Sequence, residues 1–151
     1  MMGSPGEPGI IHQAVDQVFA AIEADEDRQY LLRVSYLEIY NEALKDLLSP
    51  TASASSGRSS PLPVELKIRE RQGIIYVDPL KEEVVTRPDE VFDALDRGEH
   101  CRHVGTTDWN SRSSRSHCVF TMTIESTLRK DLMDQNGTRN QTRISQLVRL
   151  I

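Results

Sequence analysis

Residues 30–40 read Tyr-Leu-Leu-Arg-Val-Ser-Tyr-Leu-Glu-Ile-Tyr and are rich in β-branched, aromatic and aliphatic side chains. Successive side chains of a strand point to opposite faces, and here apolar residues occupy both alternating sets. A strand that is apolar on both faces belongs inside a sheet that is covered on both sides. The stretch therefore predicts a central strand of an α/β domain.

The segments on either side of this strand are interpreted from their spacing. Upstream, apolar residues recur with the period of one helical face and predict an amphipathic helix over residues 10–24: Ile11, Val15, Val18, Phe19 and Ile22. Downstream, Asn41 is expected to cap a short helical turn that runs to Leu48.

The next segment, residues 49–63, is rich in Ser, Ala, Pro and Gly and has almost no apolar bulk. It cannot bury enough surface to offset the entropy of ordering it, so a disordered surface insertion is predicted. Residues 64–69 and 73–77 then have the composition of two short strands around a turn. Residues 80–85 are expected to continue the edge of the sheet.

Pro88 begins the second helix signal, with Asp89 and Glu90 in the first turn, and the helix is predicted to end near residue 104. Residues 119–126 alternate as a strand does. A polar hairpin over residues 131–140 and a last strand over residues 143–151 follow. These segments predict an α/β domain.

Composition excludes several classes of protein. The chain has 151 residues, of which 38% are hydrophobic and 27% charged, as in a soluble globular domain. A formal net charge of −5 argues against a protein that holds polyanions through its overall field. Cys101 and Cys118 lie far apart without a CxxC spacing, so reduced thiols are expected rather than a zinc site or a disulfide. No apolar run reaches the about 18 residues that cross a bilayer, and the start has no signal-peptide pattern.

Residues 110–117 carry the chemistry that the sequence offers. They read Asn-Ser-Arg-Ser-Ser-Arg-Ser-His and lie between a predicted helix and a predicted strand. Serine hydroxyls can ligate Mg²⁺ or its waters, backbone N–H groups can hold anionic oxygens, and arginine adds fixed positive charge. On composition alone, however, a Ser/Arg-rich loop is more often a solvated linker or a phosphorylation site.

The order of these residues decides between the two interpretations, because Asn-x-x-Ser-Ser-Arg-Ser-His resembles the switch I signature of the kinesin family. Other features follow in the family's order: Gly9-Ile10-Ile11, Tyr36-Leu-Glu-Ile-Tyr-Asn-Glu with Asp46-Leu-Leu, and Arg102-His-Val-Gly with Thr107. The resemblance covers nearly the whole chain apart from the insertion. Residues 77–80 and 107–110 are similar to those of the centromere-associated and fungal tip-tracking branch.

The resemblance implies a partial P-loop NTPase fold of the kinesin-motor type over residues 1–151, with a mixed central sheet flanked by helices. Residues 106–117 would be the switch I loop. ATP and Mg²⁺ would be the cofactors. The residues at the γ-phosphate and the Mg²⁺-bound water would be Asn110, Ser113 and Ser114, with Ser114 reaching the metal through water. Arg115 would pair with a glutamate of switch II. Ser116 and His117 would either contact the nucleotide site directly or support the loop and the start of the next strand through hydrogen bonds.

The sequence lacks two motifs of a complete motor. A P-loop needs Gly-x-x-x-x-Gly-Lys-Ser/Thr, and neither this pattern nor the Asp-Leu-Ala-Gly-Ser-Glu of switch II occurs in the chain. In the family's order they fall before Met1 and after Ile151. We therefore expect an internal piece of a motor domain, incomplete at both ends and unable to hydrolyse ATP alone.

The implied partners are microtubules in the cytoplasmic cytoskeleton, with no membrane and no nucleic acid beyond the nucleotide, and a homodimer through a coiled coil outside this chain. Basic residues of the predicted strand pair and its continuation could meet acidic tubulin: Lys67, Arg69, Arg71 and Lys81. The alternative is a non-catalytic kinesin-like module that binds tubulin or another partner. A non-motor Ser/Arg-rich protein fits the ordered motifs less well.

Overall fold

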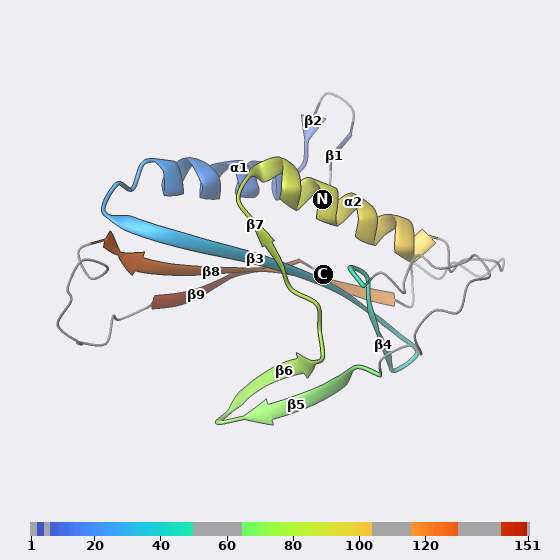
Figure 1. Cartoon of the computed structure of the whole chain (residues 1–151). Coiled ribbons are helices and arrows are strands. Elements are labelled where there is room, and N and C mark those ends of the chain that lie inside the picture. The colour runs from blue at the N-terminus through green and yellow to red at the C-terminus, as the bar shows by residue number, and fades with distance from the viewer. Residues whose placement is uncertain (1–2, 5–6, 50–64, 104–115, 130–142, 151) are drawn as a thin grey trace.

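The computed structural model describes residues 3–4, 7–49, 65–103, 116–129 and 143–150. Its main elements are two helices, α1 (Ile10–Glu23) and α2 (Pro88–His103), and a sheet (Figure 1). The sheet contains β3 (Arg28–Tyr40), β4 (Ala43–Asp46), β7 (Glu83–Val85), β8 (Ser116–Leu128) and β9 (Arg143–Leu150). Two further pairs stand apart from it: β1 (Gly3–Ser4) with β2 (Glu7–Pro8), and β5 (Lys67–Arg71) with β6 (Ile74–Asp78).

The central strand β3 organises the sheet. On one side it pairs with β8 over its whole length, from Arg28 opposite Leu128 to Tyr40 opposite Ser116. On its other side β7 and β4 share the edge, one pairing with residues 32–34 and the other with residues 37–40. β9 continues the sheet beyond β8. Every pairing among the described strands is antiparallel.

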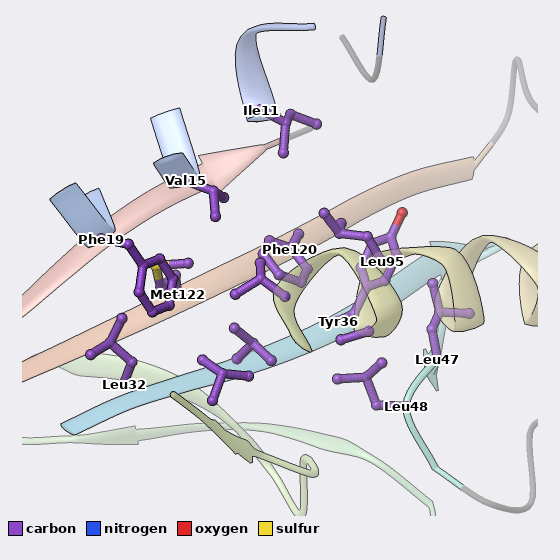
Figure 2. Close-up of a cluster of buried hydrophobic side chains, with 14 of the residues drawn as sticks. Ile11, Val15, Phe19, Leu32, Tyr36, Leu47, Leu48, Leu95, Phe120 and Met122 are labelled. Carbon is purple, nitrogen blue, oxygen red and sulfur yellow. The ribbon is translucent and has the colours of Figure 1, made fainter. Parts of the chain in front are cut away.

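Both helices pack on the same face of the sheet (Figure 1), and the hydrophobic core lies between them and the strands. The alternate residues Leu32, Val34 and Tyr36 of β3 point into it, opposite Ile124, Met122 and Phe120 of β8. Figure 2 shows the side chains that meet them from both helices: Ile11, Val15 and Phe19 of α1 and Leu95 of α2.

The second face of β3 is covered only in part by the described residues. Ser35 and Leu37 are buried there, whereas Leu31 at the other end of the strand is exposed. The expectation of a strand covered on both faces therefore holds for the helix side and for part of the opposite side.

Both predicted helices form, and their starts follow from local chemistry. Pro88 is the first residue of α2, where its fixed φ suits the helix and its missing N–H leaves no unpaired donor. The Glu90 carboxylate then accepts hydrogen bonds from the backbone N–H and the hydroxyl of Thr86, at 2.6 and 3.1 Å. This contact fixes the direction in which the chain enters α2.

The predicted helical turn after Asn41 is wrong. Asn41 and Glu42 have φ angles of 49° and 63°, and residues 43–46 are strand β4, which folds back on β3 with Tyr40 opposite Ala43. Two successive left-handed residues make the tight hairpin turn whose twist matches antiparallel strands. Asparagine is favoured both in such turns and at helix caps. The turn forms here because residues 43–46 pair with the edge of β3.

The strand pair β5–β6 forms as predicted but begins and ends a few residues later than expected. Its turn is Gln72-Gly73, again with two positive φ angles of 53° and 78°. The pair projects from the sheet as a separate hairpin (Figure 1). The predicted edge strand over residues 80–85 is shorter, because only Glu83–Val85 pairs with β3.

An ion pair ties α2 to the sheet at β7. Two guanidinium nitrogens of Arg97 contact the two carboxylate oxygens of Glu83, at 3.2 and 2.5 Å, and the Lys81 ammonium lies 2.8 Å from the same carboxylate. The hydrogen bonds from Arg97, reinforced by Lys81, lower the pKa of Glu83 to about 2. Glu83 therefore remains a carboxylate throughout the physiological range and keeps α2 beside β7.

Gly98 allows the close approach of α2 to β3. A Cβ atom at this position would lie 2.2 Å from Cδ1 and 2.6 Å from Cε1 of the Tyr36 ring. In an open helix interior, Gly→Ala stabilises by about 1 kcal/mol. Here we expect Gly98→Ala to destabilise the fold by roughly 1–3 kcal/mol, because the ring must shift within a packed core. Denaturant unfolding measures the change.

The matched control is Asp93→Ala, at an exposed position of the same helix. It should leave the free energy of unfolding unchanged or raise it slightly, since alanine is the better helix former. If Gly98→Ala were equally harmless, the close packing of α2 on Tyr36 would be wrong.

Candidate functional site: the root of a polar segment

The polar segment that carries the predicted chemistry falls between α2 and β8. Four of its candidate residues lie outside the described residues: Asn110, Ser113, Ser114 and Arg115. The structure describes the two points from which the segment starts and to which it returns, namely the last turn of α2 and the first residues of β8. We call these two points, together with the β3 and β4 side chains that contact them, the root of the segment.

Ser116 and His117 do not belong to the loop, contrary to the predicted span of residues 106–117. They are the first two residues of β8, opposite Tyr40 and Ile39 of β3. Ser116 is buried on the helix side, whereas His117 is exposed and points to the other face. A polar sequence carries no strand signal of its own. These residues are strand because β3 is long enough to pair with them.

Arg102 connects three elements at the root. From the last turn of α2, its Nη2 donates to the hydroxyl oxygen of Ser116 in β8 at 3.1 Å. Its Nε lies 3.9 Å from Oε1 of Glu38 in β3, and its Nη1 lies 3.7 Å from Oε2 of Glu99 in α2. One guanidinium thus links both ends of the segment to the central strand.

Glu38 is the most unusual side chain of the root. It is 1% exposed, and neither of its carboxylate oxygens has a hydrogen-bond partner among the described residues. Buried acids are normally paired or hydrogen-bonded, because desolvating a carboxylate is costly. Arg102 is the cation that the structure sets beside it, at the long distance given above.

Tyr36 and Cys118 complete the root, and both are held in their neutral forms. The Tyr36 hydroxyl donates to Oε1 of Glu99. Burial, and to a smaller extent this hydrogen bond, raises the pKa of the phenol far above its usual range. Burial also raises the pKa of the Cys118 thiol, which lies opposite Glu38 in β8. Neither group is therefore suited to act as a nucleophile or base near neutral pH.

Lys45 of β4 secures the end of α2. Its ammonium group donates to the backbone carbonyl of Cys101 at 2.9 Å. The last carbonyls of a helix have no partner within the helix, and a cation there also interacts favourably with the helix dipole. The root is thus held by β4 as well as by β3 and β8.

The four basic residues predicted to meet a partner do not form one patch. Lys67, Arg69 and Arg71 alternate along β5 and share one face of the hairpin; the first two pair with Glu65 and Asp78, at 3.1 and 2.8 Å. Lys81 instead donates to the Leu48 carbonyl at 3.0 Å and contacts Glu83. The structure therefore separates Lys81, which holds the fold, from the three residues of the hairpin.

Among the described residues there is neither a cluster of metal ligands nor a helix that could cross a membrane. They contain no group of three or more His, Cys, Asp or Glu side chains that could hold a metal ion. His12 stacks on Phe92 with ring centroids 4.4 Å apart, which is a packing contact. Neither helix in the described part of the chain is long and apolar enough to cross a bilayer.

A surface pocket of about 520 Å³ lies beside α2 and reaches the last turn of that helix. Its lining includes the apolar Leu47 and Leu48, together with Cys101, Lys81 and Arg97. Both of these cations contact the Glu83 carboxylate.

These features define an α/β domain in which a polar segment joins a helix to the central ladder of the sheet. The model of the kinesin motor domain family matches residues 1–150, and the chain belongs to this family.

Relatives from plants and an amoeba share this likeness. The chain is 44% identical over 134 residues to kinesin-like protein KIN-7M, chloroplastic, of Arabidopsis thaliana, a match that covers 89% of the chain and 12% of the relative. It is 44% identical over 141 residues to kinesin-related protein 4 of Dictyostelium discoideum, with 91% and 7% covered. For KIN-7I of Oryza sativa the identity is 43% over 148 residues, with 97% and 11% covered. The chain thus spans only 7–12% of these relatives.

A solved structure of a fast kinesin is similar in fold. It superposes with a TM-score of 0.75 at 30% identity, covering 97% of this chain and 36% of that chain. The kinesin-motor fold predicted from the sequence is confirmed by this match.

Sequence reasoning missed Glu38, Arg102 and Lys45 as parts of one site. The signal that could have found Glu38 was the single acid of β3, on the strand face that also carries Leu32, Val34 and Tyr36. Its partners come from distant parts of the chain and carry no local mark.

We expect Lys45→Met to lower the free energy of unfolding by on the order of 1 kcal/mol, because the Cys101 carbonyl and the end of α2 lose their cation. Methionine retains most of the length of the side chain, so packing changes little. Thermal and denaturant unfolding measure the effect. Lys67→Met, at an exposed position on β5, is the control and should change stability by less than about 0.5 kcal/mol. Equal effects of the two substitutions would contradict the assigned contact.

Proposed function

We propose that the chain is part of a microtubule-dependent motor that couples ATP binding and hydrolysis to movement, and that residues 106–115 are its switch I loop. The observation that carries the proposal is the position of the signature residues. They fall between the end of α2 and the start of β8, two points that Arg102 and Ser116 link. Membership of the kinesin motor domain family supports the same conclusion.

The candidate residues have the donor chemistry that a nucleotide site needs. Asn110, Ser113 and Ser114 would surround the γ-phosphate, and Ser114 would hold Mg²⁺ through a water molecule. Arg115 would pair with a glutamate of switch II. Bound Mg²⁺ would neutralise charge on the phosphate oxygens, and the loop would take one of two states according to whether the γ-phosphate is present.

The test compares substitutions at signature and variable positions in the full-length protein. Ser113→Ala, Ser114→Ala and Arg115→Ala should each lower the microtubule-stimulated ATPase rate by roughly 10²-fold or more, because each removes a contact to developing charge or to the closed state. Ser111→Ala and Arg112→Ala, at variable positions of the same loop, should leave the rate nearly unchanged.

If the wild-type protein bound microtubules without ATP turnover, the chain would instead be the non-catalytic kinesin-like module. Equal losses at signature and variable positions would contradict the assigned residue roles.

The β5–β6 hairpin is the surface that we propose meets tubulin. It projects from the sheet (Figure 1), and Lys67, Arg69 and Arg71 share one of its faces. Tubulin is strongly acidic, so these cations would steer the encounter even though the overall charge of the chain is negative. Lys81 lies apart from this face, with its ammonium group on the Leu48 carbonyl and Glu83, and we propose it as a separate contact to tubulin.

The double substitution Arg69→Glu with Arg71→Glu should weaken microtubule binding at low salt, and the difference from wild type should shrink as salt screens it. Co-sedimentation over a series of salt concentrations measures the affinity. Arg87→Glu, an equally exposed change just before α2, is the control and should have a smaller effect. Unchanged affinity in the double variant would exclude the hairpin as the contact.

Finer assignments extend the proposal. We place the chain in the centromere-associated and fungal tip-tracking branch, on the likeness of residues 77–80 and 107–110. We also propose a homodimer through a coiled coil outside this chain, at work on cytoplasmic microtubules. Several relatives carry names that specify the chloroplast or mitochondrion, so imaging of the tagged full-length protein is the direct test of location.

A further inference from the structure

The buried carboxylate of Glu38 requires an explanation that packing does not provide. It stands in β3 at the end of the hydrophobic core, on the same face as Val34 and Tyr36. Its neighbours across the sheet are Lys45 of β4 and Cys118 of β8. The Lys45 ammonium group is bound to a helix carbonyl, which leaves Arg102 as the cation paired with Glu38.

Arg102 and Glu38 differ in how far they are buried and in how many partners they have. The Arg102 side chain is 25% exposed and also has Glu99, Ser116 and solvent as partners. Glu38 is fully enclosed and has no hydrogen bond among the described residues. At a separation of 3.9 Å the attraction does not offset a full desolvation of the acid. A buried ion pair of this kind is weak support for the fold, but it can fix where a cation lies.

The direction in which Glu38 draws Arg102 is what matters for the root. Without an acid in β3, the guanidinium could pair with Glu99 alone and lie along the surface of α2, since both residues belong to the last turns of that helix. Glu38 lies in β3 instead, and attraction towards it brings Arg102 over the sheet, where Ser116 begins β8. Among the described residues, the Arg102–Ser116 hydrogen bond links the two ends of segment 104–115.

We propose that Glu38 is a positioning residue that holds Arg102 against Ser116 and thereby fixes the separation of the two ends of the switch segment. The inference rests on the proposed function of that segment in nucleotide binding. Glu38 touches neither nucleotide nor metal in this scheme and acts only through Arg102. Ends that are already held at one separation spare nucleotide binding part of the entropic cost of bringing them together.

The substitution Glu38→Gln separates positioning from structural support, because it preserves shape and removes the charge. If Glu38 positions Arg102, the apparent KM for ATP should rise roughly fivefold or more, while the melting temperature stays equal or increases as a buried charge is lost. Hydrogen exchange should become faster at the end of α2 and the start of β8, and not elsewhere. The experiment uses the full-length protein.

Two further variants test whether Glu38 acts through Arg102. Arg102→Gln should raise KM as Glu38→Gln does, and the double variant should be no worse than Arg102→Gln alone. Arg102→Gln should also lower the melting temperature, because it strands the buried acid, and adding Glu38→Gln should restore it. Additive losses in KM would overturn the proposal.

The matched control is Glu125→Gln, which removes an acid from β8 that pairs with Arg33 of β3 at the far end of the same two strands. It should change neither KM nor exchange at the root. A lower melting temperature for Glu38→Gln with KM and local exchange unchanged would show a structural ion pair only and overturn the proposal. If the wild-type protein bound no ATP, the proposed function would fail, and the exchange and rescue measurements would still decide the role of Glu38.

Discussion

The continuous pairing of β3 with β8 is the constraint on which the rest of the structure depends. Each residue from Arg28 to Tyr40 faces one partner in β8, so the register leaves no freedom in which side chains enter the core. A shift by one residue would exchange Val34 and Tyr36 for Arg33 and Ser35 beneath the helices. The same ladder sets the place of Ser116 beside the end of α2 and so brings together the two ends of the polar segment.

Much of this arrangement follows from local sequence. The apolar residues on both faces of β3 marked it as central, and the heptad-like spacing in α1 and Pro88 at the start of α2 marked the two helices. The signals in β3 and α1 are strong because each is repeated over several turns or residues, and that of α2 is strong because proline suits the first helical position. The kinesin-motor fold could be predicted because the ordered motifs extend along nearly the whole chain.

What could not be predicted depended on contacts between distant residues. Asn41 suits a helix cap and a left-handed turn equally, and residues 43–46 are too few to show a period, so the edge of β3 decided their structure. Ser116 and His117 became strand because β3 extends far enough to pair with them. The cluster around Glu38 was hidden for the same reason, since Arg102 and Lys45 come from other elements. The signature residues 110 and 113–115 lie outside the described residues and remain predictions.

The β5–β6 hairpin shows how one small surface can combine two kinds of interaction. On the face that carries Arg69 and Arg71, their cross-strand neighbours are Tyr76 and Ile74, and both are exposed. A partner that covers this face would meet positive charge and apolar surface together. Association would then depend on salt through the arginines, and burial of the apolar side chains would give it a negative change in heat capacity. Attraction at a distance and adhesion on contact would thus arise from different atoms of the same strand pair.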